Sequence, residues 1–463
     1  MKYISTRGQV PPVEFQAAVL MGLADDGGLI IPEAIPRVAD RLDAWRRLDY
    51  AGLAYELLRL YVDDIPEADL KEIIDGAYSR RKAFAPEVVS TVAVGEMHIL
   101  ELWHGPTLSF KDVALQLLGV LFEYILARTG SRLNILGATS GDTGSAAIAG
   151  CRRRSGIDIF IMHPLGRVSA IQQRQMTTVL DENVHNIAVA GSFDDCQQIM
   201  KTLASDLDFK RKYSLGAVNS VNWARVLAQM VYYFKAVFDV QRASGAEKVR
   251  LAVPTGNFGD ILAGWYAMQM GAPISQLILA TNENDILRRF FSSGEYSRGE
   301  VRHTLSPAMD IQVASNFERY LYYKLDGDSS ALRELMEGFA RSGSLEIEPG
   351  GDGVVDPAVT AGCGTKADCL AMIKKYHERY DYLLDPHTAV GVAVAQKAPP
   401  ADEPLICLAT AHPAKFPEAI RQATGKDLAR HPAIDALAEL PTRCENLPND
   451  TEAVREFIVD KAR

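Results

Sequence analysis

The alternation of strand-like and helix-like segments constrains the fold of this chain most strongly. From about residue 96 onward, short apolar runs rich in β-branched residues recur, with stretches of helical periodicity between most of them. The apolar runs are Arg132–Gly137, Ile157–Met162, His185–Val189, Arg250–Val253, Gln276–Ala280 and Pro404–Ala409. This alternation is typical of an α/β fold in which parallel sheets are covered by helices on both faces. Ligands of such folds bind at the carboxyl ends of the strands.

The residues before and after this region follow other patterns. We expect a mainly helical N-terminal domain over 1–95, a catalytic α/β region over 96–424 and a helical tail over 425–463. An insertion occupies about 282–385, and the residues 345–365 within it are rich in glycine and proline, which predicts a long loop. Neither the insertion nor the tail carries a pattern that indicates a function.

Composition argues against several classes of function. The chain has 463 residues and a net charge of −10, which argues against nucleic acid as a partner. Its six cysteines form no Cys-x-x-Cys pair, so we expect no metal site and the reduced thiols of a cytoplasmic protein. We also expect no signal peptide and no membrane span, because no apolar run approaches ~18 residues.

Lys111 stands where an apolar run, 98–103, meets a predicted amphipathic helix over Val113–Arg128. A lysine at the start of a helix lies at the positive end of the helix dipole, which disfavours its ammonium form. An available neutral amine is what a Schiff-base enzyme requires. The alternative is a solvated lysine beside Asp112, since charged residues are mostly exposed.

Two further turns of small residues favour a functional site over a solvated lysine. They are Ala138–Ala147 and Pro254–Asp260, and each lies between a predicted strand and a predicted helix. The first N–H groups of a helix have no partner within the helix, so such turns are places where anions bind.

Five segments in order along the chain carry a resemblance to a known family. They are Tyr3–Gly8, Gly22–Leu29, His104–Asp112, Leu305–Asp310 with Ser315–Arg319, and Ala409–Phe416. Together they resemble the threonine synthase family in its long bacterial and fungal form, and the resemblance runs nearly from end to end. It implies a pyridoxal-phosphate enzyme of fold type II, with two parallel-sheet lobes and a mainly helical N-terminal domain.

The resemblance also implies a role for each turn. Lys111 is implied to be the Schiff-base lysine and the catalytic residue. The residues implied to hold pyridoxal 5'-phosphate are Lys111, Gly256, Asn257, Phe258, Gly259, Asp260 and Thr410. The residues implied to hold the substrate are Thr139, Ser140, Gly141, Asp142, Thr143, Asn219, Ser220 and Arg225. Thr410 would face the pyridine nitrogen, and Arg225 would bind the phosphate of the substrate through its planar fork of donors.

Each of these assignments has a structural alternative. The turn at 256–259 can be a plain strand–helix connection, and Thr410 can simply end a buried strand. Asp142 can cap a helix; other fold type II enzymes carry asparagine there, so its role does not transfer directly. Arg225 can be a surface charge on a helix.

Other candidates near the turns are weaker. Arg167 and Arg174 could bind a phosphate, or could be solvated helix charges. His104 and His412 lie beside the proposed site in the sequence, and satisfied, partly buried histidines are the favoured interpretation.

The implied reaction converts O-phospho-L-homoserine and water to L-threonine and phosphate. One alternative is a pyridoxal-phosphate phospho-lyase that releases a keto acid; another is a non-catalytic binding protein, against which the intact Lys111 argues. We expect a monomer or a homodimer. The N-terminal domain is predicted to support the site without supplying the cofactor lysine or either phosphate-binding turn.

Overall fold

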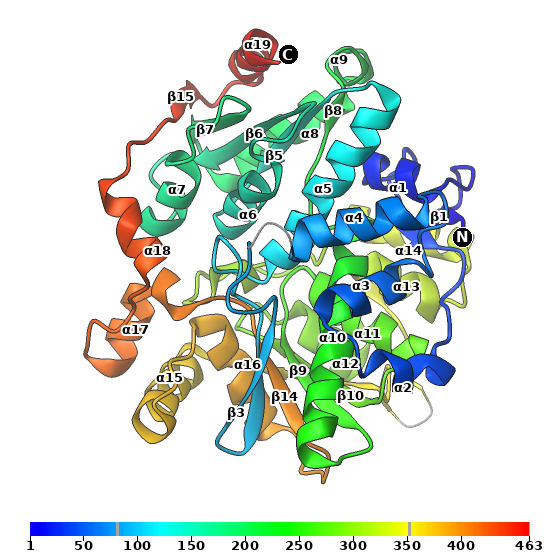
Figure 1. Cartoon of the computed structure of the whole chain (residues 1–463), viewed down its shortest axis with the longest axis vertical. Coiled ribbons are helices and arrows are strands. Elements are labelled where there is room, and N and C mark those ends of the chain that lie inside the picture. The colour runs from blue at the N-terminus through cyan, green and yellow to red at the C-terminus, as the bar shows by residue number, and fades with distance from the viewer. Residues whose placement is uncertain (80–82, 351–352, 463) are drawn as a thin grey trace.

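The computed structural model describes residues 1–79, 83–350 and 353–462 (Figure 1). Two larger sheets form the centres of two lobes, and two further sheets have two strands each. The lobes lie one above the other in Figure 1, with helices packed over both sheets. The expected α/β fold is confirmed.

The sheet of the lower lobe has six strands in the order β13-β10-β9-β14-β4-β3. They are β3 (Ser90–Val94), β4 (Met97–Glu101), β9 (Val249–Pro254), β10 (Ile274–Thr281), β13 (Val359–Cys363) and β14 (Leu405–Ala409). All neighbours are parallel except β3 and β4, which form an antiparallel hairpin. The two-residue connection between β3 and β4 requires this, because parallel strands need a long crossover. The edge strand β3 is therefore an antiparallel exception that the sequence analysis did not predict.

The sheet of the upper lobe has five strands in the order β15-β7-β6-β5-β8, and every pair is parallel. They are β5 (Leu133–Ala138), β6 (Ile157–Pro164), β7 (Val184–Ala190), β8 (Leu215–Gly216) and β15 (Glu445–Pro448). Every residue of the central strand β6 is buried. Such continuous burial is typical of a parallel strand covered on both faces.

Helices connect the strands and supply most of the core. They are α5 (Lys111–Thr129), α6 (Asp142–Cys151), α7 (Ala170–Thr177), α8 (Phe193–Ser205), α9 (Leu207–Lys212), α10 (Trp223–Ser244), α11 (Gly259–Met270) and α16 (Pro386–Lys397). Most side chains of α10 are buried, so this helix lies inside the molecule rather than on its surface. It packs against α5, α11 and α3.

The N-terminal segment is mainly helical, as expected. Its elements are β1 (Tyr3–Ser5), α1 (Phe15–Met21), β2 (Ile30–Pro32), α2 (Leu42–Trp45), α3 (Tyr50–Leu58) and α4 (Glu67–Tyr78). β1 and β2 form an antiparallel pair, while α4 packs on α5 and α3 on α10. Up to α4 the segment therefore covers helices of the catalytic region. The last part of the expected domain 1–95 differs, because β3 (Ser90–Val94) belongs to the six-stranded sheet.

The insertion is more regular than predicted. It contains α12 (Ile286–Ser293), β11 (Glu295–Ser297), α13 (Phe317–Lys324), α14 (Ser329–Ser342), β12 (Ser344–Glu346) and α15 (Lys366–Tyr380). The prediction of a long loop over 345–365 is wrong in two places: β12 extends to Glu346, and β13 (Val359–Cys363) pairs with β10. Residues 351 and 352 lie outside the described part. Small residues obscured β13, and a Cβ at Gly362 would come within 2.6 Å of Val394 on α16.

The tail contains a strand that the sequence analysis missed. Its elements are α18 (Pro432–Asp435), β15 and α19 (Thr451–Lys461), and they follow α17 (Pro417–Thr424), which ends the region before it. β15 is short, mostly exposed and polar, so it lacks the alternation that predicts a strand. The tail runs along one side of the molecule from the lower lobe to the upper sheet (Figure 1).

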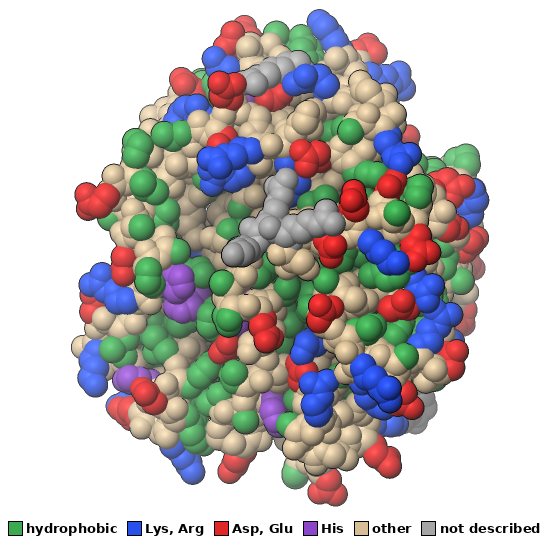
Figure 2. All heavy atoms as spheres, in the orientation of Figure 1, with side chains coloured by type: hydrophobic (Ala, Val, Ile, Leu, Met, Phe, Trp, Pro, Cys, Tyr) green, Lys and Arg blue, Asp and Glu red, His purple; other side chains and the backbone are tan. Residues whose placement is uncertain are grey.

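On the face in view, acidic and basic side chains are interspersed and do not gather into one patch (Figure 2). Among the described residues, no helix is long and apolar enough to cross a bilayer. The chemically suggestive turns follow the carboxyl ends of β4, β5, β8, β9 and β14. This placement brings segments distant in sequence toward the region between the sheets.

Candidate active site

Lys111 is the first residue of α5, and its side chain is only 12% exposed. Burial lowers its pKa to about 8; Asp142 opposes this effect, while Lys415 and Arg225 reinforce it. An ordinary lysine has a pKa near 10.4, so only about 0.4% of its amine is neutral at pH 8. A far larger share of the Lys111 amine is therefore neutral, and the largest cause is burial.

A buried aspartate braces the loop that precedes Lys111. Asp112 accepts hydrogen bonds from the backbone N–H and the hydroxyl of Thr107, at 2.9 and 2.7 Å. A Cβ at Gly105 would lie 2.4 Å from the Asp112 side chain, so only glycine fits there. Burial raises the pKa of Asp112 to about 6, although the Thr107 hydrogen bonds oppose that change. This carboxylate has a structural role that the sequence did not reveal.

Asp142 faces Lys111 across a short gap. Its Oδ2 lies 4.0 Å from Lys111 Nζ, while Oδ1 accepts from Lys415 Nζ at 2.8 Å and from Gln172 Nε2 at 2.7 Å. Burial would raise the pKa of Asp142, but Lys415 and Lys111 hold it well below its usual value. The alternative of helix capping fails, because Gly141 is the N-cap of α6. Sequence reasoning assigned no role to Lys415 or Gln172.

The turn at residues 139–144 is organised by one hydroxyl. Thr139 Oγ1 accepts from the N–H groups of Gly141 and Gly144, at 3.0 and 2.9 Å. Ser140 is exposed, and Thr143 is partly exposed. Thr139 therefore shapes the turn, whereas Ser140 and Thr143 remain accessible at the start of α6.

The turn at residues 256–259 lies against the insertion. Phe258 has a φ of +65° and is the N-cap of α11, without a side-chain cap. No backbone hydrogen bond is formed by the N–H groups of Gly259, Asp260 or Ile261 among the described residues. A Cβ at Gly256 would lie 2.3 Å from the Ala308 carbonyl oxygen, so the segment 305–310 fixes this turn. Free donors at a helix start suit a phosphate dianion.

The side chains of this turn point elsewhere. The Phe258 ring packs among Phe291, Phe317 and Tyr320. Asp260 Oδ1 accepts from the hydroxyls of Tyr232 and Tyr233, at 2.6 and 2.9 Å. Burial raises the pKa of Asp260 to about 6, and the tyrosines oppose that change. Phe258 and Asp260 therefore offer a ligand their backbone, and Asn257 alone has an exposed side chain in the turn.

Arg225 is only 4% exposed, which excludes the alternative of a surface charge. Its Nε and Nη1 have no hydrogen-bond partner among the described residues, and neither has the nearby Asn219 Oδ1. Burial lowers the pKa of Arg225 to about 10. A buried guanidinium with unused donors is costly unless an anion completes it, so this is the strongest indication of an anion site in the molecule.

The segment Ser315–Arg319 joins the two anion-binding turns. Asn316 Nδ2 donates to the carbonyl oxygens of Ser220 and Asn257, at 3.1 and 3.2 Å. Ser315 and Ser220 share a hydrogen bond of 2.8 Å between their hydroxyls. The sequence analysis noted this segment as a family motif and gave it no role.

Arg319 extends the same connection to the N-terminal segment. Its side chain donates to the carbonyl oxygens of Ile30 and Val221 and to Asn316 Oδ1. Asn222 Nδ2 makes a parallel contact with the Val19 carbonyl oxygen at 2.9 Å. Residues of the N-terminal segment thus contact the turn that carries Asn219 and Ser220, through backbone carbonyls.

Thr410 follows β14 and lies beside the lysine segment, since its carbonyl accepts from the Phe110 N–H at 2.9 Å. The Trp103 ring lies between His104 and His412, with centroid separations of 4.4 and 4.7 Å. Burial lowers the pKa of His412 to about 4, and His431 adds to this effect. His412 is therefore neutral near pH 7, in keeping with a satisfied structural histidine.

The weaker phosphate candidates have other positions. Arg174 donates to the carbonyl oxygens of Leu437, Ala438 and Leu440, so it anchors the tail. Arg167 is exposed. Neither has the unused buried donors that distinguish Arg225.

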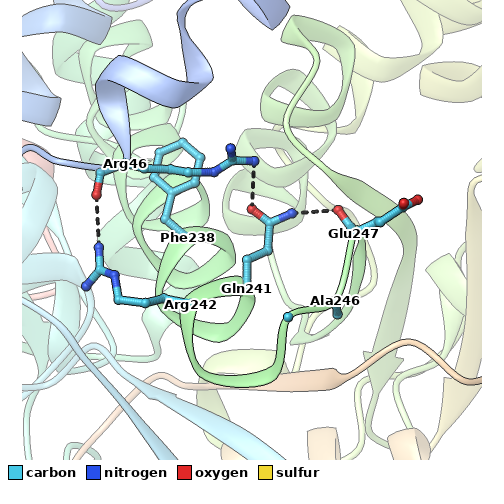
Figure 3. A pocket seen from close by; sticks show the side chains of 7 residues that line it. Arg46, Phe238, Gln241, Arg242, Ala246 and Glu247 are labelled. Atoms are coloured by element: carbon cyan, nitrogen blue, oxygen red, sulfur yellow. Dashed lines mark hydrogen bonds between the residues drawn. The ribbon is translucent and has the colours of Figure 1, made fainter.

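A hollow of about 530 Å³ lies away from these turns, where α10 ends. Figure 3 shows Gln241 of this hollow between Arg46 and Glu247, to which its amide is hydrogen-bonded. None of the turn residues lines it. The candidate site is therefore identified by the chemistry of the residues in its turns, and this hollow is not part of it.

The donor set fits pyridoxal phosphate. A buried amine with a pKa of about 8 can bond to its aldehyde, and the free N–H groups at the start of α11 can receive its phosphate. The Thr410 hydroxyl lies on the strand end next to the lysine segment. Arg225 is a second cation, and it is available to bind another anion.

Comparison with known proteins agrees with this site. Three family models match the chain: "Threonine synthase N terminus" over residues 2–78, "Pyridoxal-phosphate dependent enzyme" over 93–362 and "Threonine synthase, C-terminal" over 388–458. The threonine synthase of Pseudomonas aeruginosa is 46% identical over 99% of this chain and 98% of its own length. That of Saccharomyces cerevisiae is 45% identical over 91% of this chain and 88% of its own length.

Solved structures give the same result. The structure of threonine synthase from Brucella melitensis with bound pyridoxal phosphate has a TM-score of 0.95, at 44% identity, and covers 100% of both chains. The yeast structure has a TM-score of 0.93 at 41% identity, covering 99% of this chain and 98% of its own.

The fold and the matched models define a pyridoxal-phosphate-dependent enzyme of fold type II. More specifically, the chain belongs to the threonine synthase family. Its cofactor is pyridoxal 5'-phosphate, and its class of reaction is that of a biosynthetic lyase.

Proposed function

We propose that this chain converts O-phospho-L-homoserine and water to L-threonine and phosphate. The observation that carries the proposal is the pairing of a buried lysine amine with a buried arginine whose donors are unused. The lysine amine suits a pyridoxal-phosphate enzyme, and the arginine suits a substrate that itself carries a phosphate. The family membership supports both.

Two phosphate groups are assigned to two turns. The residues that would hold the cofactor phosphate, chiefly through backbone N–H groups at the start of α11, are Gly256, Asn257, Phe258, Gly259 and Asp260. Those that would hold the substrate phosphate are Asn219, Ser220 and Arg225, and Thr410 would face the pyridine nitrogen. Asn316 keeps the two turns at a fixed separation, because it is bonded to a carbonyl of each.

The substrate carboxylate is assigned to the turn at 139–144. Free N–H groups at the start of α6 and the accessible Ser140 and Thr143 hydroxyls suit a carboxylate. Thr139 and Gly141 shape this turn, and Asp142 orients Lys111. Such fixed donors place the α-carbon of the substrate within reach of the lysine amine.

When bound, pyridoxal phosphate supplies an electron sink for the charge that develops at the α-carbon. The neutral Lys111 amine would take the α-proton and one proton from Cβ. The bond between Cγ and oxygen would then break, and the phosphate would leave with the electron pair toward Arg225. Lys111 would deliver one proton to Cγ, which becomes a methyl group. The oxygen of water would bond to Cβ, Lys111 would return a proton to the α-carbon, and the remaining proton would leave with the phosphate.

We propose the following roles for the three parts of the chain. Residues 1–95 support the site from outside, the region 96–424 carries the chemistry and 425–463 ties the two lobes together. We propose a cytoplasmic enzyme that acts as a monomer or a homodimer.

A phospho-lyase that releases a keto acid is the alternative, because it would use the same lysine and the same phosphate site. The test is to incubate the holoenzyme with O-phospho-L-homoserine and to quantify phosphate, threonine and keto acid together. Equal amounts of threonine and phosphate are expected. Phosphate accompanied by keto acid would establish the alternative, and no phosphate release would overturn both.

A further inference from the structure

Lys415 is a buried cation for which the reaction described above has no use. Its side chain is 0% exposed, and it lies in the turn η3 (Pro413–Lys415) after β14. Nζ donates to Asp142 Oδ1 at 2.8 Å and to the Thr107 carbonyl oxygen at 2.7 Å. Burying an ammonium so completely is costly unless its partners are fixed. We therefore expect Lys415 to have a function that offsets this cost.

Asp142 lies between two lysines and interacts unequally with them. Oδ1 is occupied by Lys415 and by Gln172, whereas Oδ2 faces Lys111 across 4.0 Å. Of the two lysine contacts, only the one with Lys415 is within hydrogen-bond distance. The carboxylate therefore pairs with Lys415, and Lys111 is left with a longer, weaker attraction.

The charges that face Lys111 come from four elements. Asp142 on α6 and Asp112 on α5 favour its ammonium form; Lys415 in η3 and Arg225 on α10 oppose it. Without Lys415, the nearest opposite charge would be a carboxylate free to pair with Lys111. A nearby opposite charge of this kind moves a titration midpoint by about 1–3 units.

We propose that Lys415 is a positioning residue whose ammonium takes up the negative charge of Asp142, so that the Lys111 amine can lose its proton. Asp142 can then orient Lys111 without holding it in the charged form. The inference rests on the proposed role of Lys111 but not on the identity of the substrate.

The test measures the protonation of Lys111 directly. The full-length chain, freed of cofactor, is labelled briefly with an amine-acylating reagent at a series of pH values, and Lys111 is followed by peptide mass spectrometry. Only the neutral amine reacts, so the labelling curve gives the titration midpoint. The wild type is expected to show a midpoint near pH 8.

Lys415→Met is expected to raise this midpoint by one unit or more, which means about tenfold slower labelling below pH 8. Lys415→Arg is expected to restore it, because a guanidinium carries the same charge. The control is Lys235→Met, which removes a lysine paired with Asp239 on α10, outside the turns described above. An unchanged Lys111 midpoint in Lys415→Met would overturn the proposal.

A second variant covers the case in which Lys415→Met does not fold because Asp142 is left unpaired. The double variant Lys415→Met/Asp142→Asn removes both charges of the pair, and Asp142→Asn alone removes only one. If Lys415 opposes the charging of Lys111, the midpoint is lower in Asp142→Asn than in the double variant. Equal midpoints in these two variants would refute the inference.

The outcome is separable from that of the proposed function. Labelling requires no turnover, so a shifted midpoint with no threonine formed would uphold the role of Lys415 and refute the assigned reaction. Normal threonine formation with an unshifted midpoint would uphold the assigned reaction and refute the role of Lys415.

Discussion

Arg225 and Arg319 are two buried arginines that should respond in opposite ways to the same substitution. Burial lowers the pKa of each to about 10 from an ordinary 12.5. That depression corresponds to about 3 kcal/mol of destabilisation of the charged side chain. Arg319 regains this energy through hydrogen bonds to three acceptors, whereas Nε and Nη1 of Arg225 have none among the described residues.

Arg225→Met should therefore stabilise the enzyme in the absence of substrate, by about 2–3 kcal/mol. The unfolding entropy of a 463-residue chain is about 1 kcal/mol per kelvin, so the melting temperature should rise by about 2–3 °C. Arg319→Met should lower it, because three acceptors lose their donor. At the same time Arg225→Met should weaken phosphohomoserine binding about tenfold to hundredfold, since a charge-assisted hydrogen bond contributes about 1.5–3 kcal/mol.

The assay is thermal unfolding of the cofactor-loaded enzyme with increasing phosphohomoserine. Ligand binding to the native state raises the melting temperature in proportion to ln(1 + [L]/Kd). The wild type should be stabilised by substrate and Arg225→Met should not. If Arg225→Met melted below the wild type, or if both responded equally to substrate, the assignment of a vacant anion site to Arg225 would be wrong.

Four further outcomes are expected, from variants at three residues. Lys111→Ala should abolish threonine formation without changing the circular dichroism spectrum, and Lys111→Arg should be equally inactive because a guanidinium cannot bond to the cofactor aldehyde; turnover by either variant would contradict the assignment. Asp260→Asn should retain cofactor affinity, because only the backbone of Asp260 faces the turn, and loss of affinity in equilibrium dialysis would show that the carboxylate takes part. Burial raises the pKa of Asp260 to about 6, so the folded state binds a proton more tightly than the unfolded state does. The stability that this proton contributes is present at low pH and is lost as the pH rises through 6. In urea unfolding, Asp260→Asn should therefore be more stable than the wild type at about pH 8 and should lose that advantage near pH ~4. Asn316→Ala should weaken cofactor and substrate together, measured by separate titrations, whereas a loss confined to one would show that Asn316 does not couple the two turns.

The fold was predictable because its signals are local. Apolar runs such as Ile157–Met162 mark buried parallel strands, and glycine-rich turns mark the ends of β5 and β9. Two of the strands that were missed have weak local signals: β15 is polar and β13 is made of small residues. Their pairing depends on partners more than 80 residues away in the chain, which no local pattern encodes.

The turns of the candidate site could be proposed from the sequence, but the residues that support these turns could not. Lys111 and Arg225 belong to motifs whose chemistry can be stated from residue type and position. Lys415 and Asn316 lay in segments noted for resemblance alone, because their importance depends on which atoms they reach: Asp142 from one lobe, and Ser220 with Asn257 from two separate turns. The roles of these two residues therefore depend on three-dimensional contacts that the sequence does not give. One signal was available for Lys415, because a lysine between apolar residues, as at 414–416, indicates a buried charge.

The distribution of charge explains how an acidic chain can bind anions. The net charge is −10, yet Lys111 and the buried Lys415 both lie beside one carboxylate, Asp142, and the buried Arg225 acts electrostatically on Lys111. In a region screened from water these charges act more strongly than the exposed acidic residues, whose fields are weakened by solvent and salt. The excess positive charge is tolerable only if an anion completes it. Among the described residues, Nε and Nη1 of Arg225 are buried without a hydrogen-bond partner. The energy lost in this way is therefore available for recognition when a phosphate binds, whereas a neutral ligand would gain no comparable affinity from this charge.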